Sequence, residues 1–199
     1  RSLLVTGVQT CALPISTMGI YLNPDSDRYE RLCNSPIFVD KSLLIEYTNQ
    51  IINTENNCIC VSRPRRFGKS TDANMLVAYY SKGTNSKDLF NTLNINHCPS
   101  FLEHLNKHNV IHLNIQDFLS TTNSIDEMLV KINRMILKDL KFEFKDVITE
   151  TEIIDAFNEV YAYTKNKFIF IIDEWDCIFR EFKENRSEER RVGKECRSR

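Results

Sequence analysis

A glycine, a lysine and two hydroxyl residues follow one another at Gly68, Lys69, Ser70 and Thr71, directly after an arginine-rich stretch. Glycine lets the backbone approach a ligand closely, because it has no Cβ. Backbone N–H groups in such a loop, and at the start of the helix after it, form a concave site for anions. In this setting a lysine reaches the β- and γ-phosphates of a nucleotide, and a serine hydroxyl binds Mg²⁺. The residues therefore predict a phosphate-binding loop, with Thr71 near the α-phosphate.

Two acidic residues, Asp173 and Glu174, follow a run of five apolar residues at 168–172. Such a run is typical of a buried strand in a parallel sheet. Ligands of open α/β sheets bind where the strands end, so both carboxylates are candidates for the same site. Asp173 would join Ser70 in holding Mg²⁺, and Glu174 would polarise the attacking water. Asp176 is a nearby acidic rival of Glu174 for that second role.

The elements that must position these residues follow from the hydrophobic pattern. Residues 58–62 predict a buried strand just before the loop, and a helix is expected to begin at Ser70 or Thr71. The alternation at 110–115 predicts a second strand, and 168–173 a third. Strands that alternate with helices indicate a parallel α/β sheet.

Three further helices are predicted from their starts and their apolar faces. Asp40 precedes apolar residues at helical spacing and is expected to cap a helix. Its neighbour Lys41 is either exposed or part of a segment beside the nucleotide. Ser124 and Glu127 have the spacing of a capping box. The inward face of that helix is expected to be Ile125, Met128, Leu129, Ile132, Ile136 and Leu140. For a last helix over 149–165 it is expected to be Ile153, Ile154, Phe157, Val160 and Tyr161.

Three motifs taken together suggest a family. They are Arg-Pro-Arg-Arg-Phe-Gly-Lys-Ser at 63–70, Phe-Val-Asp-Lys-Ser at 38–42 and Ile-Asp-Glu-Trp-Asp at 172–176. Over about residues 19–184 the chain closely resembles the bacterial AAA-ATPase-like family, in which tyrosine is common where Trp175 stands here. The resemblance implies a P-loop NTPase fold, a three-layer α/β/α arrangement with a mostly parallel sheet. This sheet is expected to be incomplete at its C-terminal end.

The resemblance also implies ATP and Mg²⁺ as cofactors. The expected nucleotide-binding residues are Arg63, Pro64, Arg65, Arg66, Phe67, Gly68, Lys69, Ser70 and Thr71. Ser70 and Asp173 would hold the metal, while Lys69 and Glu174 would act in catalysis. Arg63 stands where the usual phosphate-loop pattern has its first glycine. The three arginines either form ion pairs on the rim or add positive charge that offsets this departure.

The activity expected of the full-length protein is Mg-dependent ATP hydrolysis. Two alternatives stay open. One is a nucleotide-dependent regulatory switch with little turnover, and the other is a nucleic-acid-associated module linked to defence. The second alternative is suggested by the restriction-nuclease-like region that commonly follows in the resembled family. Assembly of several copies is also left open.

Both ends of the chain look foreign to the rest. Residues 1–16 have no clear period, and residues 186–199 are basic and nearly without apolar side chains. Both resemble translated adapter DNA, so the domain is expected at 17–185. The resembled family continues with further strands, and we therefore expect this chain to be a fragment.

Charge and composition exclude several classes of protein. The formal net charge is −1, and removing the two ends leaves about −5, which gives no electrostatic case for nucleic acid. The cysteines form no disulfide framework, which favours a reducing, cytoplasmic setting. No apolar run approaches the roughly 20 residues that span a bilayer. His104 and His108 could share a helix face, yet with His97, Cys98 and His112 they fit no zinc pattern, so solvated or core histidines are expected.

Overall fold

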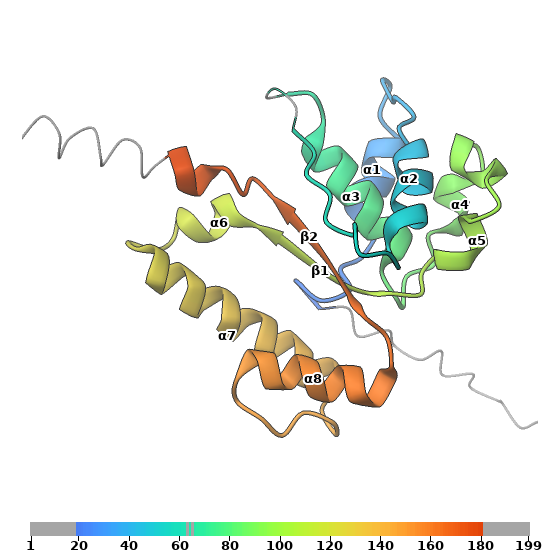
Figure 1. Cartoon of the computed structure of the whole chain (residues 1–199). Coiled ribbons are helices and arrows are strands. Elements are labelled where there is room, and N and C mark those ends of the chain that lie inside the picture. Colours follow the sequence, from blue (N-terminus) through green and yellow to red (C-terminus); the bar gives the residue numbers. More distant parts are fainter. Residues whose placement is uncertain (1–18, 63, 65, 181–199) are drawn as a thin grey trace, which may run out of the picture.

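A pair of parallel strands lies at the centre of the molecule, with helices on both faces (Figure 1). The computed structural model describes residues 19–62, 64 and 66–180. In chain order the elements are α1 Asp27–Cys33, α2 Leu43–Ile51, α3 Lys69–Tyr80, α4 Lys87–Phe90, η1 Asn94–His97, α5 Phe101–His104, β1 Asn109–Asn114, α6 Ile115–Leu119, α7 Ile125–Glu143, α8 Ile153–Thr164 and β2 Phe168–Asp173. The predicted α/β class with parallel strands is confirmed, while the full three-layer arrangement stays a prediction. None of the described helices is long and apolar enough to cross a membrane.

Strands β1 and β2 pair in parallel, from Asn109 opposite Phe168 to Asn114 opposite Asp173. The other edge of β1 is covered by residues 21–23. Asn23 N donates to the Val110 carbonyl at 2.7 Å, and His112 N donates to the Tyr21 carbonyl at 2.9 Å. On the outer edge of β2 the described residues place no further strand. Among the described residues, the sheet therefore has one covered edge and one edge without a neighbouring strand.

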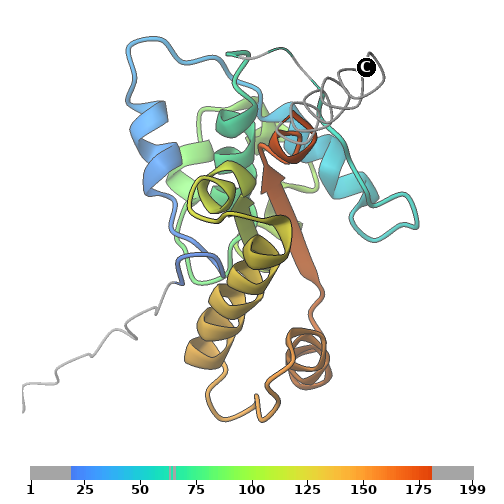
Figure 2. The ribbon, with the colours of Figure 1, turned by 90° about the vertical axis from the view of Figure 1, so that its left-hand side faces the viewer.

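One face of the sheet packs against α7 and α8, which Figure 2 shows from a second side. The capping box of α7 is confirmed, because Ser124 Oγ accepts a hydrogen bond from Glu127 N at 3.1 Å. The buried residues of α7 are Met128, Ile132, Ile136 and Leu140. They recur every four positions, so the buried stripe is narrower than expected. Leu129 follows Met128 in the sequence and therefore lies on a neighbouring face of the helix. It is half exposed, so the prediction that it faces inward is wrong.

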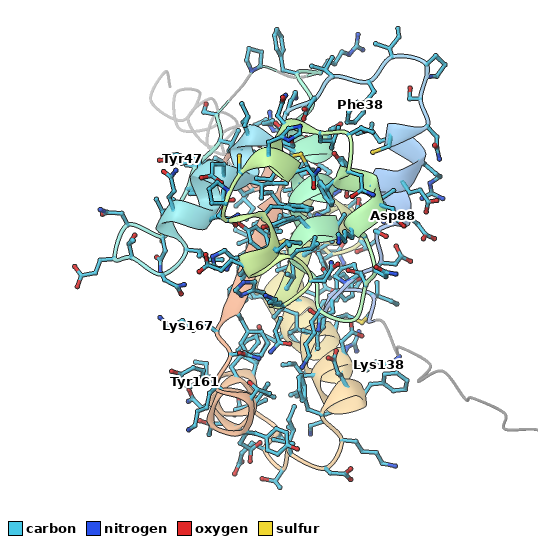
Figure 3. The ribbon with its side chains drawn as sticks, turned by 90° about the vertical axis from the view of Figure 1, so that its right-hand side faces the viewer. Phe38, Tyr47, Asp88, Lys138, Tyr161 and Lys167 are labelled. Carbon is cyan, nitrogen blue, oxygen red and sulfur yellow. The ribbon has the colours of Figure 1, made fainter. Side chains whose placement is uncertain are left out.

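The inward face predicted for α8 is likewise only partly correct. Ala156 and Val160 are buried and Phe157 is partly buried, but Ile154 and Tyr161 are exposed. Figure 3 shows Tyr161 on the side of α8 that faces away from α7. The cause is the same as in α7. Each of these two helices has only a narrow stripe of its surface covered by the elements that pack on it.

The other face of the sheet packs against α3, whose second half is almost entirely buried. Two of its tyrosines also join α3 to α2 and α5 through buried hydrogen bonds. Asn49 Nδ2 donates to Tyr79 Oη at 3.0 Å, and Tyr80 Oη donates to Asn49 Oδ1 at 2.7 Å. Tyr79 Oη donates in turn to the Phe101 carbonyl at 2.7 Å. This network satisfies polar groups that would be costly to bury unpaired.

Three sequence predictions about local structure are wrong. Residues 58–62 are not a strand: they pair with neither β1 nor β2, and the segment lies mostly exposed, with Ile59 at 41%. Asp40 does not cap α2, because Ser42 is the N-cap residue and the Asp40 carboxylate binds elsewhere. Strand β2 is not fully buried, because Phe170 and Ile172 are about half exposed.

Leu140 and Leu129 provide a matched pair on α7 that tests the observed stripe. Leu140 is 0% exposed and Leu129 is 49% exposed. Leu140→Ala should lower the free energy of unfolding by about 2–5 kcal/mol, because it leaves a cavity in the core. Leu129→Ala should cost about 0.5 kcal/mol or less. Urea unfolding followed by circular dichroism measures both, and equal losses would contradict the packing described here.

Two histidines stack at the end of α5. His104 Nδ1 and His108 Nε2 are 3.0 Å apart, and the His108 ring meets the Tyr80 ring edge-on. Burial, followed by the charges of His104 and Lys107, lowers the pKa of His108 to about 4. Neutral His108 therefore belongs to the folded state.

This histidine makes stability depend on pH. Below a pH of about 6.5 the unfolded chain binds a proton at His108. The folded chain binds this proton only when the pH falls to about 4. As the pH decreases from about 6.5 to about 4, the free energy of unfolding should therefore decrease by up to about 3 kcal/mol. His108→Phe keeps an aromatic ring at this position but cannot bind a proton. In urea unfolding it should flatten this part of the dependence of stability on pH. His97→Gln, at an exposed position, is the control and should leave the profile unchanged, and an equally steep profile for His108→Phe would refute the assignment.

Candidate phosphate-binding site

Helix α3 begins at Lys69, and Gly68 is its N-cap residue with φ 80° and ψ 30°. The first intrahelical bond runs from Asp72 N to the Gly68 carbonyl at 2.9 Å. The N–H groups of Lys69, Ser70 and Thr71 therefore belong to the first turn of the helix. The positive end of the helix dipole lies at the same place, so this terminus suits an anion. The predicted strand before the loop is absent, and the predicted helix is present but begins one residue earlier than the expected Ser70.

The left-handed conformation at Gly68 explains the residue type. An L-residue with a Cβ rarely adopts φ 80°, whereas glycine does so without cost. A Cβ at this position would also lie 2.7 Å from the Lys41 ammonium. Arg66, two residues earlier, has φ 69° despite its side chain. The chain thus turns sharply twice as it enters α3.

Lys41 reaches this turn from a distant part of the sequence. Its ammonium donates to the Phe67 carbonyl at 2.9 Å and lies 3.0 Å from Asp72 Oδ1. The Asp72 side chain is 8% exposed and that of Lys41 is 28% exposed. Of the two readings of the Lys41 segment, the structure favours the one that places it beside the phosphate loop.

Asp173 ends β2 on the face of the sheet that α3 covers. Ile171, two residues earlier, packs in the same apolar cluster as α3, and side chains two apart in a strand share a face. Asp173 is buried, and its Oδ1 accepts a hydrogen bond from Glu174 N at 2.9 Å. Both Figure 1 and Figure 2 place the C-terminal end of β2 at the end of the molecule where α3 begins. The two motifs that the sequence singled out are thus at one end of one sheet face.

Glu174 follows the strand in a left-handed conformation, with φ 52°. Its Oε2 accepts a hydrogen bond from Arg180 Nη2 at 3.1 Å. Arg180 Nε also lies 3.8 Å from Asp176 Oδ2. The two acidic candidates for water activation therefore share one arginine, a partner that the sequence patterns did not indicate.

Two residues of β1 belong to this neighbourhood and were missed in the sequence. Asn114 is the register partner of Asp173, and His112 lies two residues earlier on the same face. Burial and the nearby Arg28 charge lower the pKa of His112, while the charges of Asp173 and Asp117 oppose this. Asn114 also caps α6, since its Oδ1 accepts from Gln116 N at 3.1 Å. The available signal was that Asn114 lies near the end of a predicted strand and that His112 lies two residues earlier in the same strand.

The other predicted nucleotide-binding residues lie at the surface of the loop. Pro64, Arg66, Phe67 and Ser70 are exposed, while Lys69 and Thr71 are partly buried. Arg63 and Arg65 lie outside the described residues, so the two readings of the arginines stay open. Among the described residues no group of three histidine, cysteine or acidic side chains is placed to hold a metal ion.

Comparison with known proteins decides the family. The family described as "Predicted AAA-ATPase" matches residues 27–198, most of the chain. The chain belongs to the AAA-ATPase-like family. The match includes the Lys41 segment, the start of α3 and β2. No curated protein and no solved structure gives a significant match.

Gly68 and Gly83 provide a matched pair that tests the tight turn. Both have positive φ, 80° and 88°, but only Gly68 lies against the Lys41 ammonium. Each change to alanine should cost about 1–2 kcal/mol of unfolding free energy, because the left-handed conformation disfavours a Cβ. Gly68→Ala should cost more than Gly83→Ala in urea unfolding, since its Cβ also displaces the ammonium. A smaller loss for Gly68→Ala would contradict this close approach.

Proposed function

We propose that this chain binds Mg·ATP at the N-terminus of α3 and that the protein hydrolyses ATP. The observation that carries the proposal is the start of α3, which is entered through a left-handed glycine and carries Lys69 and Ser70. A helix start of this kind attracts phosphate through its N–H groups and dipole. Membership of the AAA-ATPase-like family supports the same ligand.

Lys69 would neutralise the β- and γ-phosphates. Two unit charges 4 Å apart interact by about 4 kcal/mol at the effective dielectric of a protein surface. Loss of this one side chain is therefore enough to change nucleotide affinity greatly. The N–H groups of residues 69–71 would bind phosphate oxygens, and Thr71 would contact the α-phosphate.

Ser70 and Asp173 would share one Mg²⁺ with the phosphates. Mg²⁺ prefers oxygen ligands and keeps several waters, so one hydroxyl and one carboxylate are sufficient protein partners. Asp173 is suited to this role because it is buried at the strand end on the α3 side of the sheet. Its second oxygen, Oδ1, is already fixed by the Glu174 N–H.

Glu174 would orient the attacking water. Phosphoryl transfer depends mainly on positioning and on stabilising charge, so the carboxylate must be held firmly. Arg180 holds one oxygen of Glu174 and leaves Oε1 for the water. The same contact supports the second candidate function, a nucleotide-dependent switch, because the arginine occupies one oxygen of the carboxylate that would orient the water.

Titration of a fluorescent ATP analogue with Mg²⁺ tests the binding site. Lys69→Ala should weaken binding by at least about tenfold, because a charged contact worth 1.4 kcal/mol or more is lost. Lys87→Ala, at an exposed position in α4, is the control and should bind like the parent. Equal affinity of Lys69→Ala and the parent would overturn the assignment.

Turnover of the same samples separates the two functions. Phosphate release by the parent that Lys69→Ala abolishes supports an ATPase. Tight binding without phosphate release supports the switch.

A further inference from the structure

We infer that Lys41 is a positioning residue of the phosphate loop: its ammonium holds the Phe67 carbonyl and thereby aims the Gly68 N–H at the bound anion. The inference rests on the proposed function, since it assigns a part in the same site to a residue 27 positions before Gly68 in the sequence. Lys41 itself does not contact the nucleotide in this role.

The argument begins with the geometry of one peptide bond. The peptide between Phe67 and Gly68 is planar and trans, so its C=O and N–H point in opposite directions. Lys41 Nζ binds the carbonyl side of this peptide at 2.9 Å. The Gly68 N–H must therefore point away from Lys41. A loop that presents N–H groups to an anion needs this orientation fixed before the ligand arrives.

Asp72 keeps the ammonium in place. Its carboxylate lies one turn into α3, is nearly buried and is 3.0 Å from Lys41 Nζ. Removal of Lys41 would leave this carboxylate buried without its charge partner, which is costly. Lys41 thus links the last carbonyl of the loop to the first turn of the helix that follows.

The backbone on both sides of Lys41 is anchored as well. Asp40 Oδ2 accepts hydrogen bonds from Asn94 N at 2.9 Å and from Asn94 Nδ2 at 2.7 Å. Ser42 Oγ accepts one from Ile95 N at 3.1 Å. Because three consecutive residues are tied to η1, to the loop and to α3, little freedom remains for the lysine to lose on binding.

Gly68 gives independent support for the contact. A Cβ built on Gly68 would lie 2.7 Å from Lys41 Nζ, closer than real Cβ atoms approach other atoms. The ammonium therefore packs directly on the residue whose N–H it orients. The turn conformation and the position of the lysine depend on each other.

The experiment uses the scarcity of glycine. The chain contains 5 glycines, so selective ¹⁵N-glycine labelling gives a spectrum of at most five backbone signals. Gly68→Ala identifies the Gly68 signal, and Gly83 is the internal reference. The variants are Lys41→Met, Lys41→Arg and the double variant Lys41→Met/Asp72→Asn, which leaves no unpaired buried carboxylate if Lys41→Met alone fails to fold. Lys87→Met, at an exposed position, is the control for loss of a positive charge.

The expected result has two parts. Without nucleotide, the Gly68 signal moves in Lys41→Met and in the double variant, while the Gly83 signal stays in place. The affinity of these variants for the fluorescent ATP analogue with Mg²⁺ falls about tenfold, the effect of losing one hydrogen bond from a charged donor. Lys41→Arg restores at least part of both, and Lys87→Met changes neither.

Two outcomes would overturn the inference. An unmoved Gly68 signal with weakened affinity would mean that Lys41 contacts phosphate directly. A displaced signal with unchanged affinity would mean that the contact is only structural. Failure of the proposed function is distinguished by Lys69→Ala: if that variant binds ATP like the parent, the nucleotide site is wrong, whereas the nucleotide-free signal of Gly68 still tests the link from Lys41 to the loop.

Discussion

The parallel pairing of β1 with β2 is the constraint on which the rest of the structure depends. Its register alternates side chains between the two faces, so Ile111 and Leu113 join the cluster under α7 and α8 while Val110 and Ile171 join the cluster under α3. A slip of one residue would exchange these faces and bury the wrong side chains. The same register sets Asn114 beside Asp173, and so it fixes the chemistry at the strand end together with the core.

Local sequence signals were reliable where a few neighbouring residues determine the local structure. The capping box at Ser124, the strand before Asp173 and the helix start after Gly68 each depend on a few neighbouring residues, and each is found in the structure. Burial was harder to predict. Leu129, Ile154 and Tyr161 have helical spacing, but which third of a helix is covered depends on how closely its partner packs. The apolar residues at 58–62 likewise need a neighbouring strand, and no local pattern shows whether the fold supplies one.

The residues of the candidate site show the same difference between local signals and contacts that are distant in the sequence. Lys69, Ser70 and Asp173 could be found from sequence because their motifs lie at the ends of predicted elements. Two other contacts of the site could not be found in this way. Lys41 and Asp72 are 31 positions apart, and Arg180, which binds Glu174, belongs to no motif. The predicted cap at Asp40 is instructive, since a carboxylate before a helix usually binds its first turn. Here the Ser42 N–H takes one oxygen and Asn94 takes the other, which binds the segment to η1.

The outer edge of β2, which no strand of the described residues covers, has a consequence for pairing. An edge strand presents unpaired N–H and C=O groups in a row, and natural proteins usually protect such edges with charge, proline or a covering segment. Here the strand is apolar up to Asp173, with Phe170 and Ile172 about half exposed. Its one charged residue stands at the very end, where the sheet meets the candidate site. Within the part of the chain that the structure describes, this edge is therefore the place where a further strand could pair with the sheet.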